Sequence, residues 1–277
     1  KLANAMVGRE MLLEVEKKPC NPGEVVLKLE GAGCDSEHAS CGISNFSLEV
    51  HRGEIVGLAG VDGNGQTDLC ELIMGLRKIT SGKITFLGKD ISHMKTKERR
   101  KLSLGYIPAD RLEAGMVGEM SLKLNMALNK PDQAPYGTKW MMNAKTMTEY
   151  TEKKMKEFNV HAAGPDIAMG KLSGGNQQKL VLAREVGEKV DLIIAAYPTR
   201  GLDIDATHFV YQTILNARDN GTAVLYISTE LEEIMQLSDR IGVLYEGTLN
   251  GIMSRENADI TTIGLLMAGK EVEVKDE

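Results

Sequence analysis

The residues best suited to chemistry stand in the run Leu172-Ser173-Gly174-Gly175-Asn176-Gln177, directly before a stretch of good helix formers. Ser173 is a favoured helix N-cap, because its hydroxyl can accept a hydrogen bond from a free N–H of the first turn. The two glycines let the backbone approach a bound group, since they carry no Cβ. Such a helix N-terminus attracts an anion, most often a phosphate. A plain glycine turn that caps an amphipathic helix is the alternative interpretation of Ser-Gly-Gly alone.

A second glycine-rich stretch, residues 60–67, lies between a short apolar run and a helix-forming segment. Strand, glycine loop and helix in this order are the context of a phosphate-binding P-loop. The spacing fits G-x-x-x-x-G-K-[ST], except that Gln66 stands at the lysine position. A neutral amide there forfeits about 1–2 kcal/mol of phosphate binding, and Asp68 in the first helical turn would repel a triphosphate. We expect a nucleotide cradle that does not catalyse hydrolysis, formed by Gly60, Gly63, Asn64, Gly65, Gln66 and Thr67.

The full string of residues 172–179, Leu-Ser-Gly-Gly-Asn-Gln-Gln-Lys, resembles the signature motif of the ATP-binding-cassette (ABC) ATPases. It has the form found in bacterial sugar and nucleoside importers, and the resemblance extends from about Pro22 onward. These ATPases work as dimers in which each ATP lies between the P-loop of one domain and the signature motif of the other. The resemblance implies that a signature motif here acts in trans through Leu172, Ser173, Gly174, Gly175, Asn176 and Gln177, and that Asp203 is the D-loop aspartate at the dimer seam.

Besides Gln66, four positions depart from the pattern of the active ABC ATPases. In that family the strand before the Pro-Thr-x-Gly-Leu-Asp segment ends in Asp-Glu, which orient Mg²⁺ and activate water. Here Ala196 and Tyr197 stand at those positions, and neither offers a carboxylate to a metal or to water. Thr229 replaces the family's histidine, and Ala109 replaces its Q-loop glutamine. The resemblance therefore implies no catalytic residues and no metal site of the chain's own. The cofactor would be ATP, and its Mg²⁺ would be bound with the partner cassette.

The elements that must position these stretches alternate along the chain. Short continuous apolar runs suit strands that are buried on both faces, and helical patterns separate them. Such alternation predicts a parallel sheet with right-handed crossovers. The fold class predicted is α/β: a P-loop NTPase-type parallel sheet core, an antiparallel β subdomain and a helical (signature) subdomain. The strands expected are residues 25–29, 46–50, 54–59, 83–88, 104–108, 192–196, 222–227, 240–245 and 248–253, with a polar loop at 31–42, and the helices 68–76, 140–158, 206–218 and 230–237.

Composition and charge narrow the function classes. The chain has 277 residues with ordinary globular composition, and no uncharged apolar run approaches the roughly 20 residues that cross a bilayer. Any membrane role would therefore go through a partner. The net charge of −6 and the pI of about 5.6 argue against nucleic acid as the main ligand. The four cysteines form no Cys-x-x-Cys pair, so we expect reduced thiols.

Residues 1–18 are expected to be a linker or the tail of a preceding copy of the same domain. The string Met6-Val7-Gly8-Arg9-Glu10 is matched near the other end by Met267-Ala268-Gly269-Lys270-Glu271, although chance is an alternative explanation. Pro19 and Pro22 lie at the boundary between this segment and the following domain, as is typical of a linker. Residues 19–277 would then form one ABC nucleotide-binding domain, with the helical subdomain at about 113–185.

Further strings narrow the resemblance to the C-terminal cassette of tandem-cassette nucleoside importers, close relatives of the ribose- and galactose-type sugar importers. They are residues 61–67, 107–111, 195–203 and 264–269. This resemblance implies the N-terminal cassette of the same protein and membrane permease subunits as partners, and a substrate-binding protein indirectly. It implies a peripheral location at the cytoplasmic face of the cell membrane, with nucleosides or monosaccharides as the cargo.

Two other functions stay open at this point. A soluble ABC-type ATPase of nucleic-acid repair or translation is one, and salt-sensitive micromolar binding to RNA or DNA would favour it. A non-catalytic nucleotide-binding or dimerisation module is the other. The sequence predicts little or no ATPase activity for the isolated chain in either case.

Overall fold

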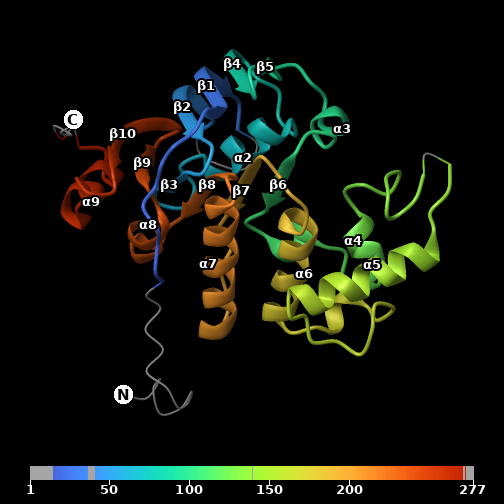
Figure 1. Ribbon diagram of the computed structural model, residues 1–277. Coiled ribbons are helices and arrows are strands. Elements are labelled where there is room, and N and C mark those ends of the chain that lie inside the picture. Colours follow the sequence, from blue (N-terminus) through green and yellow to red (C-terminus); the bar gives the residue numbers. More distant parts are fainter. Residues whose placement is uncertain (1–14, 37–40, 139, 271, 273–277) are drawn as a thin grey trace, which may run out of the picture.

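A six-stranded sheet forms the centre of the computed structural model, which describes residues 15–36, 41–138, 140–270 and 272 (Figure 1). Its strand order is β10-β9-β3-β8-β7-β6, and all neighbours pair in parallel except β10 with β9. Strands β3, β7 and β8 are buried along their whole length, as their continuous apolar sequences predict. The strands are β3 (Ile55–Ala59), β6 (Leu104–Ile107), β7 (Leu192–Ala196), β8 (Ala223–Ser228), β9 (Arg240–Tyr245) and β10 (Thr248–Ser254).

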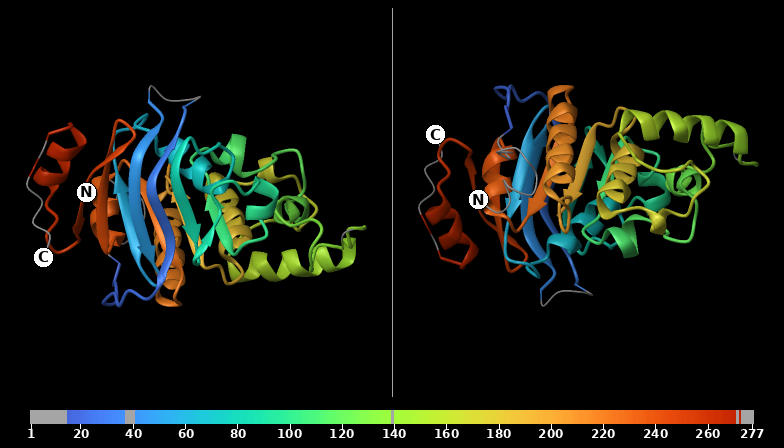
Figure 2. Two further views of the ribbon diagram at one scale, coloured as in Figure 1. Left: turned by 90° about the horizontal axis from the view of Figure 1, so that it is seen from above. Right: turned by 90° about the horizontal axis from the view of Figure 1, so that it is seen from below.

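A second, antiparallel sheet of order β2-β1-β4-β5 covers one face of the first (Figure 2). Its strands are β1 (Val25–Cys34), β2 (Ile43–His51), β4 (Ser81–Phe86) and β5 (Lys89–Asp90). The predicted loop at residues 31–42 is wrong in its first part, because β1 continues to Cys34. Register shifts between Leu29 and Ala32 let the strand pass Gly31, which has φ +57°.

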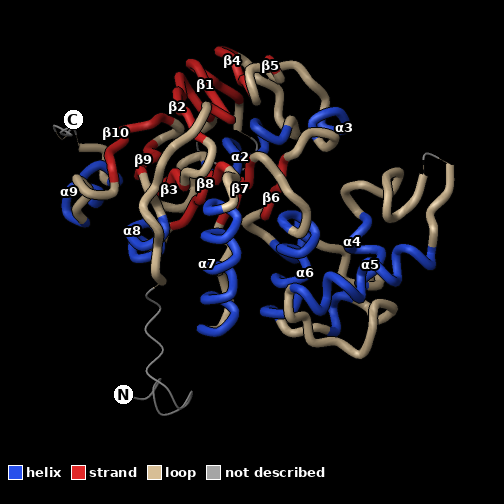
Figure 3. Tube along the Cα trace, in the orientation of Figure 1, coloured by secondary structure: helices blue, strands red, loops and turns tan. Residues whose placement is uncertain are grey.

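Helices α6, α7 and α8 cover the other face of the central sheet, α2 packs on the face of the antiparallel sheet, and α4 and α5 lie in a strand-free part to one side (Figure 3). The predicted helix at residues 140–158 begins only at Ala144, because the Asn143 side chain accepts hydrogen bonds from two N–H groups of its first turn. The helices are α2 (Gln66–Met74), α3 (Thr96–Arg99), α4 (Leu122–Ala127), α5 (Ala144–Glu157), α6 (Gly174–Val186), α7 (Ile204–Asp219), α8 (Leu231–Leu237) and α9 (Ile260–Met267), with a π turn at Arg111–Gly115 and a 3-10 turn at Met169–Lys171.

Two apolar cores lie on the two faces of the central sheet. One is enclosed by the antiparallel sheet and α2 and includes Phe46, Leu58 and Leu69. The other lies under the helices of the opposite face and includes Ile193 and Leu237. Together they fix the carboxyl ends of β3, β7 and β8, where ligands bind in sheets of this type. The predicted α/β fold class, with its antiparallel sheet and helical part, is confirmed.

Most of the predicted tail, residues 1–18, lies outside the described residues, as does the matching string at residues 6–10. Of that segment, Lys17 pairs with Asp239 (Nζ to Oδ1, 3.1 Å), and the Lys18 carbonyl accepts from Arg218 Nη1 at 2.9 Å. Within the described ranges, no helix has both the length and the apolar character to span a bilayer.

Candidate nucleotide-binding site

The glycine loop of residues 60–67 joins the buried strand β3 to the N-terminus of α2. Gly63 and Gly65 have φ of +90° and +102°, which glycine adopts without strain. A Cβ placed on Gly63 would meet nothing within 4 Å, so the loop is open at that point. Open backbone at the start of a helix fits a phosphate group.

The Gln66 side chain is turned into this loop. It is only 2% exposed, and its Nε2 donates to the Val61 carbonyl at 2.8 Å. The same nitrogen lies 2.8 Å from the position of a Cβ on Gly60. The amide that replaces the P-loop lysine is therefore used to close the loop on itself.

The β9–β10 turn is hydrogen-bonded to the glycine loop through Asn64. Asn64 Oδ1 accepts from the Glu246 N–H at 2.9 Å, and the Asn64 carbonyl accepts from the Gly247 N–H at 3.0 Å. Asn64 Nδ2 also donates to Val61 within the loop, at 3.0 Å. Sequence reasoning missed this contact, because Asn64 and Glu246 are 182 residues apart.

Asp68, which we expect to repel a triphosphate, has a cation beside it in the structure. The carboxylate is 1% exposed and faces the protein, where its Oδ1 pairs with Arg77 Nε at 2.8 Å. The Ser36 hydroxyl donates to the other oxygen at 3.0 Å. The same Arg77 Nε lies 2.8 Å from Glu71 Oε2, so one cation serves two carboxylates and weakens, without cancelling, the negative field near the loop.

The carboxyl end of β7 presents Ala196 and then Tyr197, close to the glycine loop. Tyr197 has a left-handed φ of +46°, and its N–H donates to the Ile227 carbonyl at 2.8 Å. It is 7% exposed, and its hydroxyl has no hydrogen-bond partner among the described atoms. Burial, more than the nearby Asp62 charge, raises the pKa of Tyr197, so the phenol stays neutral and cannot act as a base near pH 7.

The four positions that depart from the ABC pattern offer no carboxylate to magnesium. Ala109, Ala196 and Thr229 bring no carboxylate, and Tyr197 brings a neutral phenol. Across the described ranges, no group of three or more His, Cys, Asp or Glu side chains is placed to hold a metal ion. The backbone of the loop can therefore hold a phosphate, and the carboxylates of Asp62 and Glu230 line the hollow beside it.

Tyr197 and Arg200 separate two small hollows beside the loop. The first, of about 230 Å³, is lined by Asp62 of the glycine loop and by Thr199, Ser228 and Thr229. The second, of about 300 Å³, is lined by Ala109, Arg111 and Gln178. Arg200 Nη1 lies 3.9 Å from Asp62 Oδ2, and both side chains are largely exposed. The hollows run from the glycine loop toward the second predicted site.

That second site is the N-terminus of α6, and it has the predicted cap. Ser173 Oγ accepts from the Asn176 N–H at 3.5 Å and from Asn176 Nδ2 at 3.0 Å. Asn176 Oδ1 in turn accepts from the His161 N–H at 2.8 Å. Ser173 is exposed. Asn176 therefore braces the cap, and the Ser173 hydroxyl faces solvent.

The two glycines allow close approach of neighbouring groups. A Cβ on Gly175 would lie 3.0 Å from Ala206 Cβ, where α6 meets the start of α7. A Cβ on Gly174 would lie 3.2 Å from Arg111 Nη2. The guanidinium of Arg111 thus lies beside the positive end of α6, which adds to the attraction for an anion.

Gln177 does not face outward as the predicted nucleotide contact would require. It is 6% exposed, and its Nε2 donates to the Leu172 carbonyl at 3.2 Å. Leu172 is half-buried and packs against the core. In this structure Gln177 supports the turn before the helix. Asp203 is exposed and caps α7, because its Oδ1 accepts from the Ala206 N–H at 2.8 Å.

The family model described as ABC transporter matches residues 43–200. The chain belongs to the ABC transporter family. Its ATP-binding domain has relatives among curated import proteins. It is 40% identical to the nucleoside import ATP-binding protein NupA of Lactococcus lactis subsp. cremoris over 274 residues, 98% of this chain and 54% of that protein. It is 40% identical to the guanosine import ATP-binding protein NupO of Bacillus subtilis, over 97% of this chain and 52% of that one.

A third relative, the ribose import ATP-binding protein RbsA of Bacillus licheniformis, is 35% identical over 95% of the chain and 52% of its own length. The chain thus spans about half the length of the curated relatives it matches. Among solved structures, a nucleotide-free ATP-binding cassette from an ABC transporter superposes with a TM-score of 0.70, at 21% identity, over 91% of this chain and 98% of that one. This likeness shows the ABC ATPase fold.

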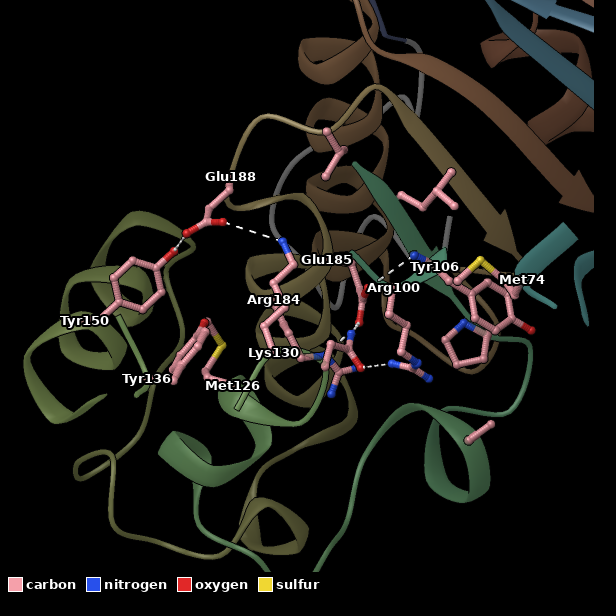
Figure 4. Close-up of a pocket in the computed structure, with 15 residues that line it drawn as sticks. Met74, Arg100, Tyr106, Met126, Lys130, Tyr136, Tyr150, Arg184, Glu185 and Glu188 are labelled. Atoms are coloured by element: carbon pink, nitrogen blue, oxygen red, sulfur yellow. Dashed lines mark hydrogen bonds and ion pairs between the residues drawn. The ribbon is translucent and has the colours of Figure 1, made fainter. Parts of the chain in front are cut away.

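The ABC domain also has a pocket between β6 and the helices α4, α5 and α6 (Figure 4). Glu185 Oε1 accepts from Arg184 Nε at 2.7 Å and from Asn129 Nδ2 at 2.5 Å, and Glu185 Oε2 accepts from the Tyr106 N–H at 3.2 Å. On the other wall, the Tyr150 hydroxyl donates to Glu188 Oε1 at 3.0 Å. Sequence reasoning did not identify these residues. They tie the helical part to the edge of the sheet.

Proposed function

We propose that the chain is the second, C-terminal cassette of a two-cassette importer protein. It supplies its signature motif in trans to ATP on the N-terminal cassette, and its own P-loop does not hydrolyse nucleotide. The names of the relatives, which import nucleosides, guanosine or ribose, support nucleosides or monosaccharides as the cargo. The span of about half of each relative supports a second cassette in the same protein.

One contrast carries this proposal. At the glycine loop, the Gln66 amide donates to the Val61 carbonyl, and Ala196 and Tyr197 stand where the ABC pattern has its two carboxylates. At the signature helix, the Ser173 hydroxyl is exposed and the glycines leave the backbone accessible. One end of the domain keeps groups that stabilise charge on a phosphate, and the other has lost the groups that split it.

The residues then have distinct tasks. ATP and Mg²⁺ would lie mainly on the partner cassette, and bound ATP would supply the phosphoryl group whose transfer drives transport. The Ser173 hydroxyl and the first N–H groups of α6 would stabilise negative charge on the γ-phosphate. Asp203 would lie at the seam. The Gln177 amide would reach the nucleotide only after leaving the Leu172 carbonyl.

The same proposal implies the partners of the domain and its location. The helical part and the loop at Ala109 would contact permease subunits, which would place the domain at the cytoplasmic face of the membrane as a peripheral subunit. A substrate-binding protein would act on the other side. Residues 1–18 would connect to the preceding cassette, and residues 19–277 would form this one, with its helical subdomain at about 113–185.

Steady-state ATP turnover of the isolated chain with Mg²⁺ at neutral pH tests the proposal. We expect a rate far below about 1 s⁻¹, the low end of ordinary enzymes. The reason is that neither Tyr197 nor Thr229 can activate water. A rate near or above about 1 s⁻¹ would show that the chain hydrolyses ATP by itself and would overturn the assignment.

A further inference from the structure

Glu233, in helix α8, holds a buried carboxylate that the nucleotide chemistry does not use. It is 7% exposed and accepts four hydrogen bonds, all from hydroxyl groups. Oε1 accepts from Thr199 Oγ1 at 2.6 Å and from the Tyr211 hydroxyl at 3.0 Å. Oε2 accepts from Ser228 Oγ at 2.8 Å and from the Tyr226 hydroxyl at 3.0 Å. A buried charge with all of its lone pairs occupied is rigidly oriented.

The four donors come from three different elements (Figure 1). Tyr226 and Ser228 belong to β8, Tyr211 to α7, and Thr199 to the segment of residues 198–203 that ends at Asp203. Burial, followed by the charge of Glu233, raises the pKa of Tyr211 and of Tyr226, so both phenols remain protonated donors. The cluster therefore joins the end of β8, just before Thr229, to the segment at the seam.

The same segment is held from its other side by the signature helix. Gln178 of α6 is 3% exposed, and its Nε2 donates to the Pro198 carbonyl at 2.7 Å. Pro198 and Thr199 are adjacent, so two buried side chains hold neighbouring residues from opposite directions. A continuous set of contacts runs from Ser228 through Glu233, Thr199 and Pro198 to the helix whose N-terminus is Ser173.

We propose that Glu233 is a positioning residue, which holds the segment of residues 198–203 between β8 and the signature helix and so orients the half-site that this domain supplies in trans. This inference rests on the proposed function. Glu233 contacts no nucleotide in this account. It acts through Thr199, and a misplacement of about 1 Å at a reacting centre is enough to lower a rate substantially.

The test compares three substitutions in the full-length protein assembled with its permease. Thr199→Val keeps the shape of the side chain and removes the donor to Glu233. We expect it to lower kcat for ATP by about tenfold, with KM for ATP changed by less than about twofold, because the segment is misplaced while ATP binding on the partner cassette is intact. Thr199→Ser retains the hydroxyl and should restore kcat.

Tyr211→Phe is the matched control, because it removes a donor to the same carboxylate oxygen but leaves Thr199 in place. We expect its kcat to stay within about twofold of the original, since coupling through this contact does not reach the seam. Thermal unfolding of each variant confirms that it is folded. A kcat loss that is equal for Thr199→Val and Tyr211→Phe would overturn the inference, because the cluster would then be merely structural.

Ser173→Arg in the same assay separates this inference from the proposed function. If Ser173→Arg abolishes turnover and Thr199→Val leaves kcat unchanged, the positioning role is wrong and the proposed function stands. If Ser173→Arg leaves turnover intact, the signature motif does not act in trans, and both are overturned. A drop in kcat for Thr199→Val with rescue by Thr199→Ser supports the positioning role.

Discussion

The two helix N-termini that could bind a phosphate differ in how their side chains are used. At the start of α2, Gln66 bonds to Val61, Asn64 bonds to the β9–β10 turn, and Asp68 pairs with Arg77. At the start of α6, Ser173 is exposed and its hydroxyl accepts hydrogen bonds from its neighbour Asn176. Both helix N-termini present backbone N–H groups that can bind an anion. In the proposed function, the glycine loop thus keeps a backbone suited to a phosphate, while its side chains serve the fold.

Among the contacts at the start of α2, the one between the glycine loop and the β9–β10 turn should be the most sensitive to substitution. Gly247 has φ +75°, and a Cβ there would lie 1.8 Å from the Gly42 carbonyl oxygen. We expect Gly247→Ala to lower the free energy of unfolding by about 2–4 kcal/mol, through backbone strain and displacement of the turn. Urea unfolding of the isolated chain measures this loss.

Gly63→Ala is the matched control for that substitution. Its φ of +90° is also left-handed, but a Cβ would meet nothing within 4 Å. Only the backbone strain remains, so the expected loss is about 1–2 kcal/mol. Equal losses for the two variants would mean that the turn moves freely away from the loop and does not hold it.

Gln66→Lys returns the missing ammonium to the glycine loop and sharpens the comparison from the chemical side. We expect nucleotide to bind the isolated chain more tightly by about 1–2 kcal/mol, roughly fivefold to thirtyfold, because a charged donor replaces a neutral one. Calorimetric titration with ATP measures this, and Gln66→Met controls for side-chain length.

ATP turnover of the Gln66→Lys variant should stay far below about 1 s⁻¹, because the substitution brings no carboxylate to Ala196 or Tyr197. Turnover that appears with this single change would contradict the account. It would mean that the lysine alone was missing, and that the two ends differ less than we propose.

Asp203 offers the smallest effect. It caps α7 and, in the proposed function, also lies at the seam between the two cassettes. Asp203→Ala should lower the free energy of unfolding by about 1 kcal/mol, because the N-cap bond to Ala206 is lost. Asp203→Asn keeps a capping oxygen and should leave that free energy almost unchanged. In the full-length protein, Asp203→Asn should still reduce uptake by about twofold to fivefold. This is the size of effect expected when one partly exposed charge is removed. If Asp203→Asn leaves uptake unchanged, Asp203 caps α7 but has no role at the proposed seam.

Much of the fold could be predicted because it depends on local sequence. The strands β3, β7 and β8 are continuous apolar runs, and such runs indicate burial on both faces whatever the rest of the chain does. The Ser173 cap depends on three successive residues and was also predictable. The start of α5 was misplaced because Asn143, a local cap, was not recognised.

The remaining features depend on residues that are distant in sequence. Gln66 could be identified as a departure from the P-loop pattern, but its bond to Val61 depends on the folded loop. The Asn64–Glu246 contact spans 182 residues and leaves no periodic signal. Glu233 was one acidic residue in an amphipathic helix, and only the packing of α7, α8 and β8 collects its four donors.

One pair of variants tests the central claim most directly: Ser173→Arg and Gln66→Ala, each in the full-length protein with its permease, compared by ATP-driven uptake. The account predicts that Ser173→Arg lowers uptake by about 100-fold or more, as expected for the loss of transition-state stabilisation by a preorganised donor. Gln66→Ala should reduce it far less, because the Gln66 amide donates to Val61 within its own loop. Equal losses from the two substitutions, or a greater loss from Gln66→Ala, would contradict the assignment of the two ends.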